Sequence, residues 1–180
     1  MHIVLLGAPG SGKSSIASGF AARSFGKYEH LSSGDIARHL AECDELTQTA
    51  LTRGEYAPEA AMRAEMAARI ERAVLNNKFL IIDGFPRMLA QVVVLEEILK
   101  EPPRYIEILC PPYVCLRRAV IRGRKHDKPD SIASRFEAYK RDTKSVIEML
   151  RKSSAIYSLR NHPGSEESAI NELIRIAGVR

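Results

Sequence analysis

The segment at residues 7–14, G-A-P-G-S-G-K-S, constrains this chain more than any other feature. An apolar, β-branched run precedes it at residues 3–6, and apolar residues at helical spacing follow at residues 14–22. Glycines between a strand and a helix let backbone N–H groups surround a phosphate, and the helix dipole adds to the attraction. The order of strand, loop and helix therefore predicts a phosphate-binding loop, and it disfavours a simple glycine-rich turn with a surface lysine.

The residue types in this loop assign a role to each position. In a G-x-x-x-x-G-K-S loop the lysine, Lys13, reaches the β- and γ-phosphates of a nucleoside triphosphate, and the serine, Ser14, binds Mg²⁺. We expect the hydroxyls of Ser11 and Ser15 to be polar groups at the start of the helix instead of metal ligands. The predicted triphosphate-binding residues of the segment are Gly10, Ser11, Gly12, Lys13, Ser14 and Ser15.

Composition and cysteine spacing narrow the class of protein. A length of 180 residues with 45% hydrophobic residues suits one compact domain. No apolar run reaches the length of a membrane span, and the first residues resemble a core strand instead of a signal peptide. Cys43, Cys110 and Cys115 lack the paired spacing of a zinc site or a disulfide framework, so we expect reduced thiols and a cytoplasmic location.

The charge of the chain gives little support to nucleic acid as a partner. The net charge is +5, but the 27 basic residues neither form a tail nor alternate with aromatic residues. They recur instead in the segments where a polyphosphate would lie. We therefore expect a small polyphosphate ligand, with only a weak affinity for larger polyanions from net charge alone.

Five short apolar segments divide the chain, at residues 3–6, 28–31, 79–82, 105–109 and 156–159. Stretches with helical periodicity separate them, and this alternation predicts an α/β fold with a parallel sheet covered on both faces. A further amphipathic stretch covers residues 132–150, and the last helix is expected to stop at Gly178. The helix after Pro58 is expected to bury Met62, Met66, Ile70 and Val74.

Polar motifs follow two of the predicted strands. The motif H-L-S-S-G-D-I-A-R ends at Arg38, and F-L-I-I-D-G-F-P-R ends at Arg87, with Gln91 four residues later. Because ligands of open α/β sheets bind at the carboxyl ends of the strands, we expect both arginines and Asp83 to converge on the phosphate-binding loop. Asp83 either holds Mg²⁺ through water or caps the following turn, and Asp35 is expected to cap a helix.

These motifs resemble those of the adenylate kinase branch of the nucleoside monophosphate kinases, from residue 1 to about Tyr157, and G-F-P-R is the most specific of them. The resemblance implies a three-layer P-loop NTPase fold with a five-stranded parallel sheet, in a single domain over residues 1–180. It implies a helical AMP-binding arm at about residues 33–62 and a lid at about residues 122–128. The implied activity is Mg²⁺-dependent, reversible transfer of the ATP γ-phosphoryl group to AMP, giving two ADP, by a monomer.

The resemblance also implies an AMP site. Arg38 and Arg87 match the pair that holds the AMP phosphate, and Gln91 matches the residue that reads the base edge. A glutamine amide donates and accepts at once, which suits the N1 acceptor and N6 donor of adenine, whereas pyrimidine-specific relatives carry asparagine after F-P-R. Tyr56 either touches the AMP base or covers the arm. The implied AMP-binding residues are Ser33, Arg38, Glu55, Tyr56, Ala57, Gly84, Phe85, Arg87, Gln91, Arg124 and Arg135.

Four further arginines belong to the implied site. Arg118 and Arg122 are four residues apart, followed by Arg124 and, eleven residues later, by Arg135. The resemblance places Arg118 against the ATP adenine and the other three on the γ-phosphoryl group in transfer. Each of these arginines, taken alone, is as readily explained as a charged side chain on the solvent-exposed face of a helix. The assignment therefore depends on their joint spacing. The implied catalytic residues are Lys13, Arg87, Arg122, Arg124 and Arg135.

The lid departs from the family pattern. Only Gly123 separates Arg122 from Arg124, too little chain for a zinc-binding insert, and the pair His126-Asp127 replaces two acidic residues. Because lid closure excludes water, we expect so short a lid to raise ATP hydrolysis or loosen donor choice.

Two other functions stay open from the sequence. One is a kinase for another nucleoside monophosphate or a small hydroxyl metabolite. The other is a nucleotide-dependent regulator or RNA-associated ATPase on the same scaffold. Arg38, Arg87 and Gln91 argue against the second, because a protein without an acceptor has little need of a second nucleotide site.

Overall fold

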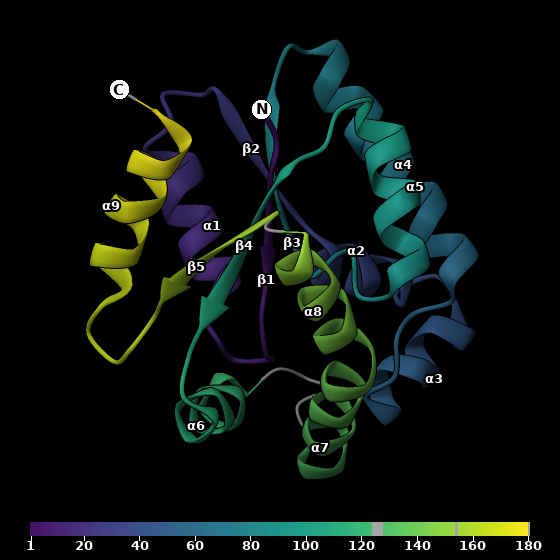
Figure 1. Ribbon diagram of the computed structural model, residues 1–180. Coiled ribbons are helices and arrows are strands. Elements are labelled where there is room, and N and C mark those ends of the chain that lie inside the picture. Colours follow the sequence, from purple (N-terminus) through teal and green to yellow (C-terminus); the bar gives the residue numbers. More distant parts are fainter. Residues whose placement is uncertain (124–127, 154, 180) are drawn as a thin grey trace.

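The computed structural model describes residues 1–123, 128–153 and 155–179 (Figure 1). The strands in this part of the chain are β1 (Ile3–Leu6), β2 (Tyr28–Ser32), β3 (Phe79–Asp83), β4 (Arg104–Leu109) and β5 (Ile156–Arg160). The helices are α1 (Lys13–Ala22), α2 (Ser33–Leu40), α3 (Glu45–Arg53), α4 (Glu59–Leu75), α5 (Leu89–Leu99), α6 (Pro112–Arg122), α7 (Pro129–Ala138), η1 (Tyr139–Thr143), α8 (Lys144–Lys152) and α9 (Glu166–Ala177). None of the helices in these ranges is long and apolar enough to cross a membrane.

All the strands pair in parallel in one sheet, with the order β2-β3-β1-β4-β5. This confirms the predicted five-stranded parallel sheet. Asp83 at the end of β3 pairs with Leu5 of β1 on one side and with Ser32 of β2 on the other. The phosphate-binding loop after β1 and the polar motifs after β2 and β3 therefore begin side by side at one edge of the sheet.

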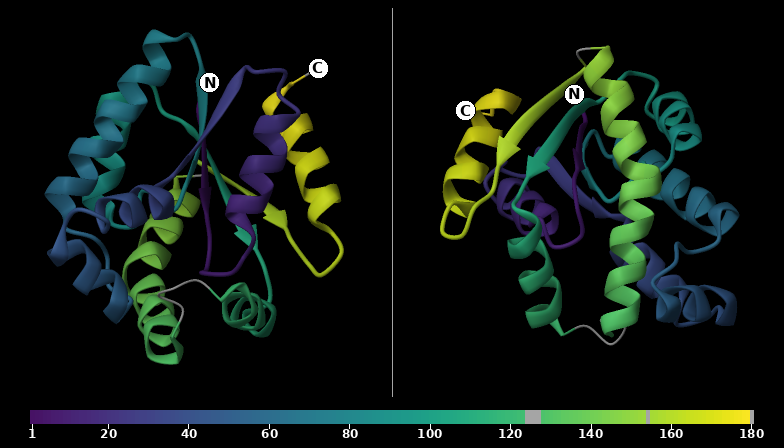
Figure 2. Two further views of the ribbon diagram at one scale, coloured as in Figure 1. Left: turned by 180° about the vertical axis from the view of Figure 1, so that it is seen from behind. Right: turned by 60° about the horizontal axis from the view of Figure 1, so that its bottom comes forward.

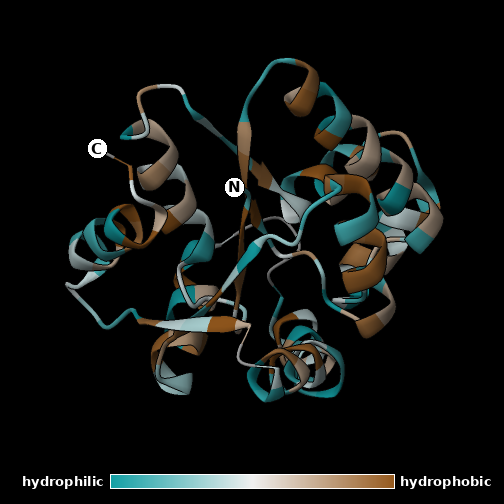
Figure 3. Ribbon diagram, turned by 45° about the horizontal axis from the view of Figure 1, so that its top comes forward, coloured by the Kyte–Doolittle hydropathy of each residue, from teal (hydrophilic) through white to brown (hydrophobic). Residues whose placement is uncertain are grey.

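Helices cover both faces of this sheet, as Figures 1 and 2 show. Along β1, Ile3 and Leu5 cluster with residues of α1 and α9, whereas Val4 and Leu6 cluster with residues of α4, α5 and α8. Successive side chains of a strand point to opposite faces, so a strand covered on both sides is a continuous apolar run. Figure 3 shows this strand, beside the N-terminus, as hydrophobic along its length.

The buried face of α4 differs from the prediction at one position. Val74, predicted to be in the core, is 44% exposed, and the buried side chains are Met62, Met66, Ile70 and Ala73. Three successive steps of four residues rotate a side chain by about 120° away from its starting face, because a helix has 3.6 residues per turn. A step of three residues, from Ile70 to Ala73, returns the apolar stripe to the sheet.

The cap of α2 also differs from the prediction. Ser32, not Asp35, is the N-cap residue, and its hydroxyl accepts a hydrogen bond from the backbone N–H of Asp35. Asp35 lies in the first turn of the helix, where its carboxylate forms an ion pair with Arg38. At the other end of the chain, α9 stops before Gly178 as predicted.

The amphipathic stretch at residues 132–150 contains a π-helical turn, η1, between α7 and α8. Turns of this kind are rare and occur frequently at functional sites. The apolar spacing of the sequence does not distinguish a π turn from an α turn, so it was not predicted. The first and last residues of η1, Tyr139 and Thr143, line the cavity described next.

Candidate active site

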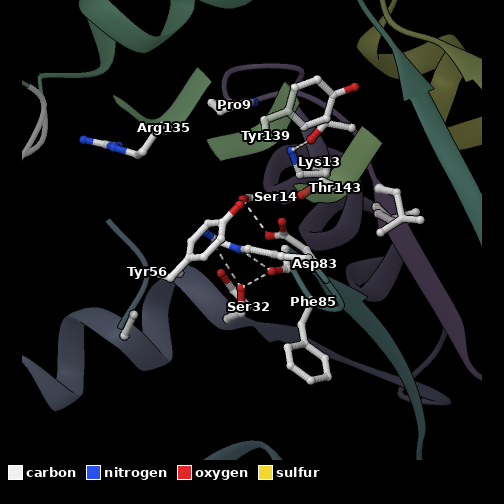
Figure 4. A pocket seen from close by; sticks show the side chains of 18 of the residues that line it. Pro9, Lys13, Ser14, Ser32, Tyr56, Asp83, Phe85, Arg135, Tyr139 and Thr143 are labelled. Atoms are coloured by element: carbon white, nitrogen blue, oxygen red, sulfur yellow. Dashed lines mark hydrogen bonds between the residues drawn. The ribbon is translucent and has the colours of Figure 1, made fainter. Parts of the chain in front are cut away.

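A cavity of about 430 Å³ opens at the carboxyl ends of β1, β2 and β3 (Figure 4). Its walls come from the phosphate-binding loop, from α2, α3 and the start of α4, and from α6, α7 and η1. Ser11 is fully buried and is not part of the lining, and Arg124 lies outside the described residues. The predicted site residues that line the cavity are Gly10, Gly12, Lys13, Ser14, Ser15, Ser33, Arg38, Glu55, Tyr56, Ala57, Asp83, Gly84, Phe85, Arg87, Gln91, Arg118, Arg122 and Arg135.

Lys13 folds back onto the phosphate-binding loop. Its Nζ donates to the carbonyl oxygens of Gly7 and Ala8, at 2.9 and 2.8 Å, and lies 3.3 Å from the hydroxyl of Ser11. Desolvation lowers the pKa of Lys13 to about 8, although the negative charge of Asp83 opposes the shift. A phosphate beside this ammonium group would favour its charged form, so the loop is suited to an anionic ligand.

Two neighbouring segments hold the backbone of this loop. Gly10 has a φ of +77°, and a Cβ atom there would lie 2.1 Å from the carbonyl oxygen of Cys115 in α6, so the position requires glycine. Beyond β5, Asn161 donates a hydrogen bond from Nδ2 to the carbonyl oxygen of Ser11 at 2.7 Å. These contacts fix the shape of the loop without any ligand.

Asp83 ends β3 and is 4% exposed. The hydroxyl of Ser14 donates to Asp83 Oδ2 at 2.7 Å (Figure 4), and His30 Nε2 lies 3.3 Å from the same oxygen. Burial alone would raise the pKa of Asp83, but the hydrogen bonds with His30 and Ser14 and the charge of Lys13 outweigh it, so the pKa is lowered. The site therefore keeps a charged carboxylate beside a hydroxyl group.

Ser14 and Asp83 have the chemistry of a magnesium site. Mg²⁺ prefers oxygen ligands, keeps several water molecules, and usually takes one or two carboxylates together with substrate phosphates. This oxygen pair, next to the phosphate-binding loop, fits that pattern. Within the described ranges, no group of three or more His, Cys, Asp or Glu side chains could hold a metal ion. A magnesium ion at Ser14 and Asp83 would thus be completed by water and phosphate oxygens.

At the other end of the cavity, the residues after β3 form a connected cluster. Arg87 donates from Nε to the carbonyl oxygen of Gly84 at 2.7 Å and from Nη2 to the hydroxyl of Ser33 at 3.4 Å. Ser33 donates to the same carbonyl at 2.7 Å. The buried Gln91 accepts a hydrogen bond at Oε1 from the backbone N–H of Arg87 at 2.8 Å. Together with Arg38, this cluster places two guanidinium groups and an amide in one wall.

The remaining arginines reach the cavity from α6 and α7. Arg118 donates from Nη2 to the carbonyl oxygen of His162 at 3.4 Å, and Arg135 donates from Nε to the carbonyl oxygen of Ser131 at 3.2 Å. Arg122 is exposed and also lines the cavity. Among the described residues, six basic side chains line the cavity against three acidic ones. This excess of positive charge in a concave site attracts polyanions.

Some residues of the site were not predicted. His30 reaches Asp83 from the neighbouring strand, and Asn161 reaches the loop from beyond β5. Tyr139 and Thr143 line the cavity from the π turn. Only His30 had a usable signal, because pairing the two strands puts Ser32 beside Asp83 and His30, two residues earlier, on the same face of the sheet. The other contacts depend on how distant segments pack.

Comparison with known proteins agrees with this geometry. A family model described as adenylate kinase matches residues 5–155 of the chain. The chain belongs to the adenylate kinase family. The adenylate kinase of Prochlorococcus marinus strain MIT 9301 is 33% identical over 86% of this chain and 87% of its own length. That of Corynebacterium urealyticum is 32% identical over 82% of this chain and 84% of its own length.

A third relative extends the similarity over nearly the whole chain. The adenylate kinase of Synechococcus sp. strain CC9311 is 33% identical over 99% of this chain and 97% of its own length. The family and the P-loop fold that the motifs predicted are therefore confirmed. In this member of the adenylate kinase family, the matched span contains the phosphate-binding loop, α2 to α4 and all the arginines of the cavity.

Proposed function

We propose that this protein transfers the γ-phosphoryl group of ATP to AMP, reversibly and with Mg²⁺, giving two ADP. The observation that carries the proposal is one cavity lined both by the phosphate-binding loop and by the cluster of Arg38, Arg87 and Gln91. Membership of the adenylate kinase family supports ATP as the phosphoryl donor. A regulator that only binds or hydrolyses a triphosphate needs the first set of residues, whereas a phosphotransferase needs both.

On the donor side, we assign the β- and γ-phosphates to Lys13 and the loop amides. An incoming phosphate would replace the carbonyls of Gly7 and Ala8 as acceptors for the ammonium group, and charge-assisted hydrogen bonds are the stronger ones. Helix α1 begins at Lys13, so its N-terminal amides and dipole favour the same anion. Bound Mg²⁺ would neutralise charge on the phosphate oxygens. Ser14 would bind the ion, and Asp83 would hold it through water.

On the acceptor side, we assign the AMP phosphate to Arg38 and Arg87. The phosphoryl group in transfer carries negative charge on its equatorial oxygens, so catalysis consists of positioning and positive charge. We assign that positive charge to Arg122 and Arg135, which line the cavity from α6 and α7. Arg124, assigned the same role, lies outside the described residues. No general base is required in this scheme, because positioning dominates.

Gln91 should determine the preference for adenine. Its Oε1 is engaged by the backbone N–H of Arg87, so its Nε2 is the group suited to donate to adenine N1. We expect Gln91→Ala to lower kcat/KM for AMP by about tenfold relative to other nucleoside monophosphates, the size of one hydrogen bond.

The matched variant for this test is Gln91→Glu, which keeps an acceptor for Arg87 but has no amide donor when ionised. It should lose the preference for AMP to a similar extent while the Arg87 segment stays in place. Equal losses for AMP, CMP, UMP and GMP in both variants would contradict the base-reading role.

An acceptor screen tests the proposed function. With Mg²⁺ and ATP, ADP formation should require a nucleoside monophosphate and be fastest with AMP. Fast transfer to CMP, UMP or GMP with none to AMP would identify a different nucleoside monophosphate kinase. ATP hydrolysis without transfer, together with steeply salt-dependent RNA binding, would favour the RNA-associated ATPase.

We further propose a monomer with two nucleotide sites in one domain, an AMP-binding arm at about residues 33–62 and a short lid at about residues 122–128. Helices α2 and α3 and the start of α4 occupy the first range, whereas residues 124–127 lie outside the described part of the chain. The three cysteines are free, which suits a reducing compartment such as the cytoplasm.

A further inference from the structure

Tyr56 lies on the arm between α3 and α4, and its ring faces Arg87. The guanidinium carbon of Arg87 is 4.8 Å from the centroid of the ring, within the range of a cation–π contact. The guanidinium group therefore lies over the face of this half-buried ring. This contact lies at the acceptor end of the cavity, next to Ser33 and Gly84.

The other contacts of this guanidinium group are at its edge. Nε of Arg87 donates to the carbonyl oxygen of Gly84 at 2.7 Å, and Nη2 donates to the hydroxyl of Ser33 at 3.4 Å. The two hydrogen bonds fix the direction of the side chain, and the contact with the ring restricts its movement. A planar cation held in this way is pre-organised, so less freedom is lost when a phosphate binds.

Tyr56 lies near the last residue of η1, Thr143, and Figure 4 shows both side chains in the cavity. Burial raises the pKa of Tyr56, whereas Arg87 and Thr143 oppose this shift. Two residues before Tyr56, the chain lies against α7, because a Cβ atom on Gly54 would be 2.3 Å from the carbonyl oxygen of Ser131. The arm therefore packs closely against α7 just before Tyr56.

We propose that Tyr56 is a positioning residue for the acceptor phosphate, holding the Arg87 guanidinium group with its ring. This inference deepens the proposed function and rests on it. A phosphate accepts hydrogen bonds from the N–H groups of a guanidinium group, so it can bind Arg87 while the ring contact is kept. In this role Tyr56 acts on the phosphate and not on the base, which distinguishes it from a residue that contacts adenine.

Binding of AMP and of adenosine to Tyr56→Leu tests this role. Leucine keeps an apolar side chain on the arm but has no aromatic face for Arg87. We expect AMP to bind about tenfold more weakly, the cost of immobilising one long side chain that is no longer pre-organised. Adenosine, which has no phosphate, should inhibit competitively against AMP with an unchanged inhibition constant. The KM for ATP should also be unchanged.

Two conservative variants complete the design. Tyr56→Phe keeps the ring and should recover most of the AMP affinity. Thr143→Val should weaken AMP binding by less than Tyr56→Leu does. If Tyr56→Leu does not fold, the ratio of AMP to adenosine affinity in these two variants gives the same test, with a loss confined to AMP as the expected result.

An equal loss of AMP and adenosine affinity would overturn the inference in favour of a base contact or a structural role. So would unchanged AMP binding in the folded Tyr56→Leu protein. These outcomes concern Tyr56 alone. Failure of the unmodified protein to phosphorylate AMP would instead refute the proposed function.

Discussion

Replacing Lys13 with methionine should reduce kcat by about a thousandfold or more, a loss of about 4 kcal/mol of transition-state stabilisation. Lys13 is the basic residue whose Nζ contacts the phosphate-binding loop directly, through the carbonyls of Gly7 and Ala8. Methionine fills similar space without charge, so the loop would lose the cation on the β- and γ-phosphates. The rate of ADP formation at saturating ATP and AMP measures the effect.

Lys27→Met is the matched control, because Lys27 is exposed and precedes β2 at the opposite edge of the sheet from the cavity. It should retain full activity, and both variants should unfold near the temperature of the unmodified protein. AMP binding to Lys13→Met should be unchanged, because Arg38 and Arg87 are intact. A kcat within about tenfold of normal, or about 1.4 kcal/mol, would contradict the role of Lys13.

Asp83→Asn should reduce kcat by about a hundredfold and raise the Mg²⁺ concentration needed for half-maximal activity by about tenfold, as expected when the charge of a metal-holding carboxylate is lost. Asparagine has the same shape and can still accept the hydrogen bond from Ser14, so the loop should keep its structure. The carboxylate that also attracts Lys13 would be absent. Titration of activity with Mg²⁺ at fixed ATP measures both quantities.

Glu59→Gln provides the comparison for this variant. Glu59 is another carboxylate that lines the cavity, but it lies at the start of α4, whereas Asp83 is the carboxylate that is hydrogen-bonded to Ser14. Its loss should leave the Mg²⁺ dependence unchanged. If Asp83→Asn responds to Mg²⁺ as the unmodified protein does, Asp83 is a structural partner of Ser14 and His30 and not a metal-holding residue.

The sheet was predictable because its three central strands, β1, β3 and β4, are buried on both faces. A residue such as Ile81 has no exposed side in the sheet, so the strand contains an uninterrupted apolar run. The buried face of a helix was harder to predict from the sequence. Val74 and Ala73 are both compatible with an apolar stripe, and only the orientation of α4 against the sheet decides which of them is buried.

The candidate site was predictable where its residues lie in motifs at strand ends, as Asp83 and Arg87 do. Parallel strands bring these ends together, so the motifs had to meet once the sheet was known. The contact between Tyr56 and Arg87 and the hydrogen bond from Asn161 to Ser11 depend instead on side chains from distant segments. No local pattern encodes such contacts, because they are set by how helices and loops pack on the sheet.

The central claim is that one cavity binds a triphosphate donor and a monophosphate acceptor at the same time. Calorimetry with two adenosines joined by a chain of five phosphates tests it most directly, because such a ligand must fill both ends of the cavity. The account predicts one linked ligand per protein chain, displacement by either ATP or AMP, and weakened binding in both Lys13→Met and Arg87→Ala. Binding that only ATP displaces, and that Arg87→Ala leaves unchanged, would contradict it.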